Sequence, residues 1–256
     1  AVCALAVFYS TMTVDLAILT ATGFEQDRLQ GATAAPLCTN VARRSWIRGT
    51  LGRQAVLLVE TGMGAVNCAH ALTCLLQTHA PRAVWQVGVG GAYERSGLEP
   101  GDVAVATREC YGDIGVRLDD GWQDAQETIG IPLLCSDTTD GQSYFNCFDL
   151  DAARARDMAQ RLNGVWRAQA GPFVTVQECT GSDDLGRERG ERFDALCENM
   201  EGAAAAHLCA LYDVDFVEVR AISNIAARRD RDAWELPLAC LRAQEAALLL
   251  LNGDCR

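Results

Sequence analysis

Lysine is absent from this 256-residue sequence, so all 22 basic residues are arginine. Chemistry that needs an amine side chain, such as Schiff-base formation or the lysine of a phosphate-binding P-loop, is therefore excluded. Basic charge is also scarce overall, because 34 acidic residues leave a net charge of −12. A nucleic-acid backbone or an anionic membrane surface attracts a basic patch, so we expect neither as a partner.

Disulfide and metal signals are missing as well. No two of the twelve cysteines form a C-x-x-C pair, and they are scattered through apolar segments, where a free cysteine acts as a small hydrophobe. We expect all twelve to be reduced and structural, in a cytoplasmic protein. His70, His79 and His207 lack ligand spacing or a neighbouring carboxylate cluster, so we expect no metal site.

Cofactor and membrane signals are equally weak. The glycine-rich turn Thr61–Gly64 leads into a helix, but Asn67 stands where a dinucleotide fingerprint has its third glycine, so we expect no cofactor. Residues 1–12 are apolar but too short to span a membrane, and they lack the basic start of a signal peptide. We treat them as an extension of unknown role, with Met12 as a candidate start, and 13–256 as one domain.

Strand and helix patterns alternate along the chain, which predicts an α/β fold. The segment 119–146 lacks periodicity and is rich in turn residues, so we expect mostly loop there. The expected strands are 15–21, 56–60, 82–89, 171–181 and 214–222, another begins near 101, and the longer expected helices are 65–79, 151–162, 184–197 and 235–251.

The stretch 198–232 carries the strongest functional pattern. Asn199 is a good N-cap for an alanine-rich helix, and Glu201 falls in the first turn of that helix. Ser223 and Asn224 follow the next strand at its carboxyl end, where open α/β sheets bind ligands. One acid and one amide would thus face the same crevice. Spacing alone leaves a second interpretation open, because such a glutamate often serves only the helix dipole and Ser-Asn is a common turn.

Two motifs carry a family resemblance. Asn199-Met200-Glu201 before the alanine-rich helix, and the segment VRAISN that ends at Asn224, resemble the purine nucleoside phosphorylase/nucleosidase superfamily, and within it the futalosine hydrolases. The resemblance implies a single-domain three-layer α/β/α fold with a central mixed, partly barrel-like sheet. It also implies a small-molecule purine nucleoside as substrate and a homo-oligomer, either a dimer or an assembly of dimers.

The same resemblance separates hydrolysis from phosphorolysis. In the phosphorylases, a Gly-Asp-Pro loop and an arginine in the third expected strand hold phosphate, whereas this chain lacks the loop and has Gln86 at the arginine's position. Water is therefore the expected nucleophile. Counting without a gap from Ala21, the catalytic glutamate of the nucleosidases falls on Glu25, with Asp27 as the alternative.

Three residues are assigned to catalysis from this resemblance and their chemistry. Glu201 would bind a sugar hydroxyl and stabilise the cationic sugar, Glu25 would act as general base on water, and Asn224 would meet the purine at N7. An asparagine N–H also suits a 6-oxo group such as that of hypoxanthine. Asp113 is expected to have a structural hydrogen-bonding role. The expected substrate contacts are Gly88, Val89, Gly90, Cys179, Thr180, Asn199, Met200, Ser223 and Trp234.

The resemblance therefore implies hydrolysis of the N-glycosidic bond of futalosine, which releases hypoxanthine and dehypoxanthine futalosine in the futalosine pathway of menaquinone biosynthesis. A methylthioadenosine/S-adenosylhomocysteine nucleosidase is the main alternative, although Asn224 departs from the aspartate of those enzymes. A purine nucleoside phosphorylase is disfavoured by Gln86. A non-catalytic nucleoside-binding protein is disfavoured because Glu25, Glu201 and Asn224 occur together.

Overall fold

The computed structural model describes residues 14–119, 121–135, 143–228 and 230–253. The expected extension, residues 1–12 with the candidate start Met12, lies outside the described residues, and its role stays a prediction. Within the described ranges, no helix combines the length and the apolar composition that crossing a membrane requires.

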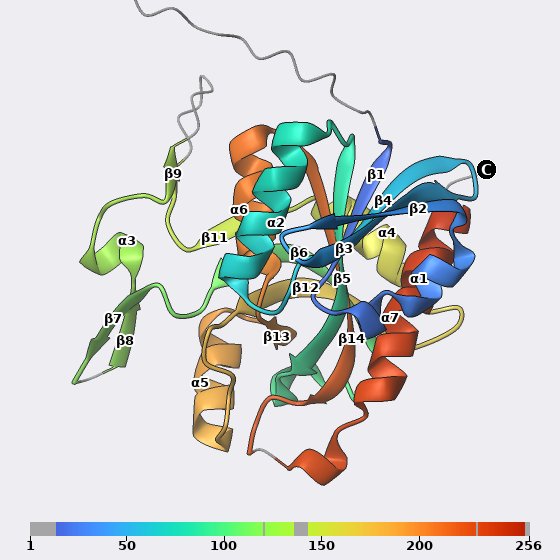
Figure 1. Ribbon diagram of the computed structural model, residues 1–256. Coiled ribbons are helices and arrows are strands. Elements are labelled where there is room, and N and C mark those ends of the chain that lie inside the picture. Colours follow the sequence, from blue (N-terminus) through green and yellow to red (C-terminus); the bar gives the residue numbers. More distant parts are fainter. Residues whose placement is uncertain (1–13, 120, 136–142, 229, 254–256) are drawn as a thin grey trace, which may run out of the picture.

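Five strands of a ten-stranded mixed sheet close into a ring at the centre of the molecule (Figure 1). They are β5 (Ala83–Ala92), β6 (Val103–Tyr111), β12 (Ala168–Thr175), β13 (Cys197–Asn199) and β14 (Asp215–Ile225). The ring closes because β14 pairs in parallel with β5 and antiparallel with β6. Outside it are β1 (Leu16–Thr20), β4 (Gln54–Glu60), β3 (Arg44–Leu51) and β2 (Ala34–Val41), which continue from β5, and β11 (Cys147–Asp149), which pairs with β6.

Helices cover both faces of this sheet. In β1, Leu16 and Ile18 pack with residues of the helices on one face, and Ala17 and Leu19 pack with those on the other. A strand buried on both faces reads as a continuous apolar run, as the sequence LAIL does. These layers confirm the expected three-layer fold with its partly barrel-like sheet. The helices are α4 (Ala152–Leu162) and α7 (Leu236–Gly253) on one face, α2 (Ala65–Thr78) and α6 (Gly202–Tyr212) on the other, with α1 (Asp27–Ala32) beside α7 and α5 (Asp183–Arg192) at one end.

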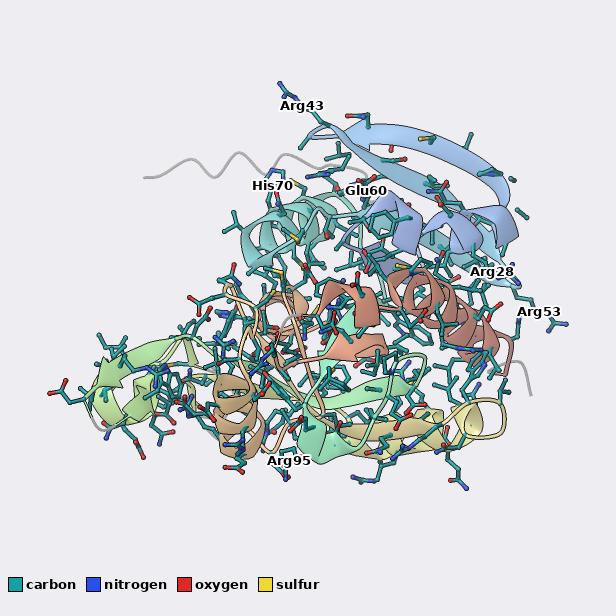
Figure 2. All side chains as sticks on the ribbon, turned by 90° about the horizontal axis from the view of Figure 1, so that it is seen from below. Arg28, Arg43, Arg53, Glu60, His70 and Arg95 are labelled. Atoms are coloured by element: carbon teal, nitrogen blue, oxygen red, sulfur yellow. A yellow bond between two sulfur atoms is a disulfide. The ribbon has the colours of Figure 1, made fainter. Side chains whose placement is uncertain are left out.

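The β2–β3 hairpin was not predicted from the sequence. Its turn is Ala42-Arg43, and both residues adopt positive φ, 48° and 68°. Such two-residue turns usually contain Asn-Gly or Asp-Gly, and neither dipeptide occurs at this turn. Figure 2 shows Arg43 at the tip of the hairpin, pointing away from the body of the protein.

Short elements interrupt the segment that was expected to be mostly loop. They lie between β6 and α4 and pack largely on one another. Because each is short, none produces a recognisable periodicity in the sequence. Within 119–146 they are β8 (Gly121–Asp124), α3 (Ala125–Thr128), β9 (Leu134–Cys135) and β10 (Ser143–Tyr144), and β7 (Gly115–Leu118), just before that segment, pairs with β8.

The expectation that all twelve cysteines are reduced is wrong for one pair. Cys110 in β6 and Cys147 in β11 face each other across paired antiparallel strands and form a disulfide. The two residues are 37 positions apart, so only the strand pairing brings them together. The other cysteines within the described ranges form no disulfide.

The helix expected at 184–197 is shorter than predicted. It ends at Arg192, and Asp194 then turns the chain with a positive φ of 50°. Cys197 lies in β13, between β12 and β5. The ring would stay open without this short strand, so the demands of sheet closure override the local helical propensity.

A buried glutamine attaches α7 to the segment that follows β1. The Gln244 side-chain oxygen accepts hydrogen bonds from the backbone N–H groups of Arg28 (2.7 Å) and Leu29 (3.3 Å). Its amide nitrogen donates to the carbonyl oxygens of Phe24 (3.1 Å) and Cys240 (2.9 Å). This one side chain, 3% exposed, therefore fixes the position of the short turn η1 (Gly23–Glu25).

We expect Gln244→Leu to lower the free energy of unfolding by ~1–3 kcal/mol, because buried backbone groups lose their partner. The matched control is Gln77→Leu, since Gln77 is exposed on α2 and donates to the Tyr212 hydroxyl at the surface. Urea denaturation of both variants measures the difference. Equal losses in the two variants would show that Gln244 has no special anchoring role.

Candidate active site

A cavity of about 330 Å³ opens at the carboxyl ends of β1, β5, β12 and β14. Chain segments far apart in the sequence meet here because these strands are neighbours in the ring or beside it. Ligands of open α/β sheets bind at the same end of the strands. Of the residues expected to form the site, the cavity lining includes Glu25, Val89, Gly90, Cys179, Thr180, Asn199, Met200, Glu201, Ser223, Asn224 and Trp234.

Glu25 ends the turn η1 and is 3% exposed. The Thr22 backbone N–H and hydroxyl donate to one of its oxygens, at 2.9 and 2.6 Å, and the Val89 N–H donates to the other at 3.1 Å. Burial raises the pKa of this carboxyl above its ordinary value, although Thr22 and the charge of Arg220 oppose the shift. Asp27, the alternative, is exposed and does not line the cavity.

Gly88, expected to contact the substrate, does not line the cavity. It lies behind the cavity wall, where a Cβ would come 2.7 Å from a Glu25 carboxyl oxygen and 2.9 Å from the Arg220 guanidinium. Glycine is therefore needed here for the space it leaves. The expected glycine loop is also part of β5, which continues to Ala92.

Glu201 is the N-cap of α6 and is 3% exposed. One carboxyl oxygen accepts the Gly64 N–H at 2.8 Å, and the other meets Arg220 at 3.2 Å. Asn199 is not the N-cap that the sequence indicated, because it is the last residue of β13. Its side-chain oxygen nevertheless accepts the N–H groups of Glu201 (2.9 Å) and Gly202 (2.7 Å). The Asn199 side chain therefore orients the backbone that carries Glu201.

Arg220 is a buried, charged residue of the site that was not among the residues expected from the sequence. It is 1% exposed in β14, and its guanidinium donates to Glu218 (2.8 Å), to the Val89 carbonyl (3.1 Å) and to Glu201 (3.2 Å). Burial lowers the pKa of Arg220, but the neighbouring carboxylates of Glu218 and Glu201 raise it overall, so the side chain is charged. The available signal was an arginine two residues after a glutamate inside a β-branched strand pattern.

Ser223 and Asn224 lie inside β14, not beyond it as expected, because the strand continues to Ile225 through an irregularity after Ile222. The Ser223 hydroxyl donates to the Asn224 side-chain oxygen at 2.8 Å. The Asn224 amide nitrogen donates to the Ile225 carbonyl at 3.0 Å. An amide nitrogen has two hydrogens, so one N–H of Asn224 remains for a ligand.

Glu198 is a second lining residue that the sequence did not reveal. Its carboxylate accepts the Thr180 N–H (2.9 Å), the Thr180 hydroxyl (2.5 Å) and the Tyr93 hydroxyl (3.2 Å). A Cβ on Gly91 would lie 3.6 Å from the Glu198 side chain and 3.2 Å from the Asn224 amide nitrogen. A carboxylate acceptor and an amide donor are therefore neighbours at this end of the cavity.

Gln86 and Asp113 lie outside the cavity lining. Gln86 is fully buried in β5 and accepts a weak hydrogen bond from Cys68, so it supplies no cation for an anionic ligand. Asp113 accepts the Gln177 backbone N–H at 2.8 Å, which is the structural role expected of it.

Comparison with known proteins identifies the family of this chain. The phosphorylase superfamily model matches residues 15–252. The futalosine hydrolase of Thermus thermophilus is 31% identical over 211 residues, which cover 82% of this chain and 87% of that protein. The 5′-methylthioadenosine/S-adenosylhomocysteine nucleosidase of Anoxybacillus flavithermus is 28% identical over 227 residues, covering 84% and 88%.

The fold has close counterparts among solved structures. The methylthioadenosine/S-adenosylhomocysteine nucleosidase of Neisseria meningitidis, in complex with methylthio-immucillin-A, superposes with a TM-score of 0.78 at 22% identity. The alignment covers 94% of this chain and 99% of that one. The sequence match along nearly the whole length, together with the shared fold, shows that this chain belongs to the phosphorylase superfamily.

Proposed function

We propose that this protein is a purine nucleosidase that hydrolyses the N-glycosidic bond of futalosine, with hypoxanthine and dehypoxanthine futalosine as products. Its place would then be in the futalosine pathway of menaquinone biosynthesis. The observation that carries the proposal is that Glu25, Glu201 and Asn224 line one cavity. The 31% identity to a futalosine hydrolase favours this substrate among purine nucleosides.

The sugar end of the site would contain Glu201. Cleavage of an N-glycosidic bond passes through a sugar with oxocarbenium character, which a nearby carboxylate stabilises electrostatically. Glu201 is held in place by the Gly64 N–H and by Arg220, so it needs no reorganisation when positive charge develops. The same carboxylate can accept a hydrogen bond from a ribose hydroxyl.

Glu25 would act as the general base. It is buried, lines the cavity and is fixed by Thr22 and Val89. Its raised pKa makes its carboxylate a stronger base than an exposed glutamate, which suits proton removal from an attacking water. Phosphate as the nucleophile is disfavoured because Gln86 is buried behind the wall and offers no positive charge.

Asn224 and Glu198 would recognise the base. The free N–H of Asn224 can donate to O6 of hypoxanthine, and the carboxylate of Glu198 can accept its N1–H. Adenine offers an amino group and an unprotonated N1 at these two positions, so it would leave buried groups unpaired at a cost of ~1–3 kcal/mol. This complementarity favours a 6-oxopurine over a 6-aminopurine.

A methylthioadenosine/S-adenosylhomocysteine nucleosidase is the second candidate, supported by the 28% identity to such an enzyme. Incubation of the purified protein with futalosine, methylthioadenosine and inosine, with and without phosphate, tests the proposal. We expect phosphate-independent release of hypoxanthine from futalosine at the highest kcat/KM. Preferential release of adenine from methylthioadenosine would select the alternative, and a requirement for phosphate would indicate a phosphorylase.

A homo-oligomer, dimeric or built from dimers, is part of the same proposal. Phe24 and Met63 line the cavity mouth and are 53% and 62% exposed. Exposed apolar side chains at the rim of a site support contact with another apolar surface.

Glu201→Gln should fold but lose base release by ~10²-fold or more, because an amide cannot stabilise a cationic sugar. Glu60→Gln is the control, since Glu60 pairs with Arg44 (3.4 Å) and does not line the cavity. Steady-state kinetics on both variants give the comparison. Turnover near the wild-type level in Glu201→Gln would remove Glu201 from the mechanism.

Glu25→Gln should lower kcat/KM by ~10²–10⁴-fold, the range for loss of a general base. In the wild type, kcat/KM should rise with pH through the raised pKa of Glu25, because only the ionised carboxylate accepts a proton. Asp27→Asn, an exposed position two residues away, should leave both the rate and the pH profile unchanged. The reverse outcome, an inactive Asp27→Asn and an active Glu25→Gln, would assign the base to Asp27.

Asn224→Asp should shift the substrate preference from 6-oxo towards 6-amino purines. A carboxylate accepts from an amino group but repels an oxo oxygen, and opposed changes of ~1–3 kcal/mol move the kcat/KM ratio by tens-fold or more. The ratio is measured for futalosine and its 6-amino analogue in the wild type and the variant. An unchanged ratio would show that Asn224 does not recognise the base.

A further inference from the structure

Two fully buried glutamates lie behind the proposed sugar site and are not used by the mechanism above. Glu109 in β6 and Glu218 in β14 are both 0% exposed, and neither lines the cavity. Glu109 accepts hydrogen bonds from the Thr175 hydroxyl (2.9 Å) and from the Asn199 amide nitrogen. Glu218 accepts the Arg220 Nε–H at 2.8 Å. Both carboxyls therefore contact residues that hold Glu201.

The two carboxyls lie beside each other under the first residue of α6. A Cβ on Gly202 would come 2.1 Å from one oxygen of Glu109 and 2.3 Å from Oε2 of Glu218. These distances place the two oxygens at most about 4.4 Å apart, the sum of the two. Any other residue at position 202 would occupy this space, so the glycine is part of the arrangement.

Charge balance at this place requires a proton. The guanidinium of Arg220 pairs with Glu201 and Glu218, and Glu109 lies beside Glu218, so three ionised carboxylates near this one buried cation would leave two negative charges uncompensated. Glu218 Oε2 is buried and, among the described residues, has no donor other than a proton carried by Glu109. Burial, and then the charge of Glu218, raise the pKa of Glu109 well above its ordinary value.

The other titratable side chains around the pair do not supply that proton more readily. For each of these side chains, burial is the main cause that raises the pKa above its ordinary value. All of them therefore stay neutral. They are Cys68 in α2, Tyr111 in β6 and Cys197 in β13.

We propose that Glu109 and Glu218 form a carboxylic acid–carboxylate pair that shares one proton and positions Asn199 and Arg220, and through them Glu201. The protonated Glu109 donates to Glu218 Oε2 and still accepts from Asn199. The singly charged pair leaves Arg220 shared between Glu218 and Glu201. The functional consequence rests on the role proposed for Glu201, whereas the shared proton itself does not.

Loss of the shared proton at alkaline pH would put a second negative charge beside Asn199 and Arg220. Both side chains would be drawn towards the pair and away from Glu201. The pH profile of kcat should therefore have an alkaline limb that belongs to the pair, separate from the acid limb of kcat/KM assigned to Glu25.

Glu218→Gln tests the shared proton directly. In this variant a glutamine N–H replaces the shared proton, the glutamine oxygen still accepts from Arg220, and Glu109 carries the single negative charge. We expect kcat within a few-fold of the wild type and no alkaline limb. Glu218→Leu, which is similar in size but cannot accept from Arg220, should lose kcat by tens-fold or more. Glu218→Gln should thus keep the kcat that Glu218→Leu loses.

An infrared measurement supplies a readout that needs no substrate. The wild type should show the carbonyl band of a buried protonated carboxylic acid at neutral pH, and Glu218→Gln should lack it. Persistence of that band and of the alkaline limb in Glu218→Gln, or absence of the band from the wild type, would overturn the proposal. Kinetics use whichever of futalosine and methylthioadenosine the wild type cleaves. If it cleaves neither, the proposed function fails while the infrared band still decides the pair.

Discussion

The buried guanidinium of Arg220 is the interaction on which the site depends. It joins Glu201 at the cavity, Glu218 behind it and the Val89 carbonyl in the neighbouring strand. A buried charge is tolerated only when it is paired and hydrogen-bonded, and removal of one partner leaves the others uncompensated. The carboxylates of Glu201 and Glu218 therefore form one electrostatic unit with this arginine.

The closed ring of strands makes this unit possible. Because β14 pairs with both β5 and β6, Glu218 of β14 lies beside Glu109 of β6, and Arg220 of β14 reaches the Val89 carbonyl of β5. Glycines let these side chains approach: Gly88 leaves room for Glu25 and Arg220, and Gly202 leaves room for the glutamate pair. An open sheet would expose the same groups to water, which would weaken every charge interaction among them.

Much of the fold was predictable because its signals are local. The buried strand at residues 16–20 shows a continuous apolar run, and α2, α4 and α7 were expected within one or two residues of their observed bounds. What failed had no local signal. The turn of the β2–β3 hairpin is Ala-Arg and contains no glycine. Strand β13 has three residues and forms through its pairing in the ring, not through local propensity. Helix ends, such as that of α5, also lack a clear local signal, so the sequence placed them less accurately.

The sequence by itself determined which side chains come to the cavity: Glu25 after the first strand, Glu201 before the alanine-rich helix and Asn224 near the end of β14. The strand and helix patterns placed these residues at element ends, and the family resemblance then indicated which of them meet in the cavity. Only the tertiary structure decided what surrounds them. Glu198 and Asn224 meet beside Gly91, and Glu109 lies next to Glu218, and both arrangements join strands distant in sequence. Burial and pairing set the charge of such groups, and neither can be read from residue type alone.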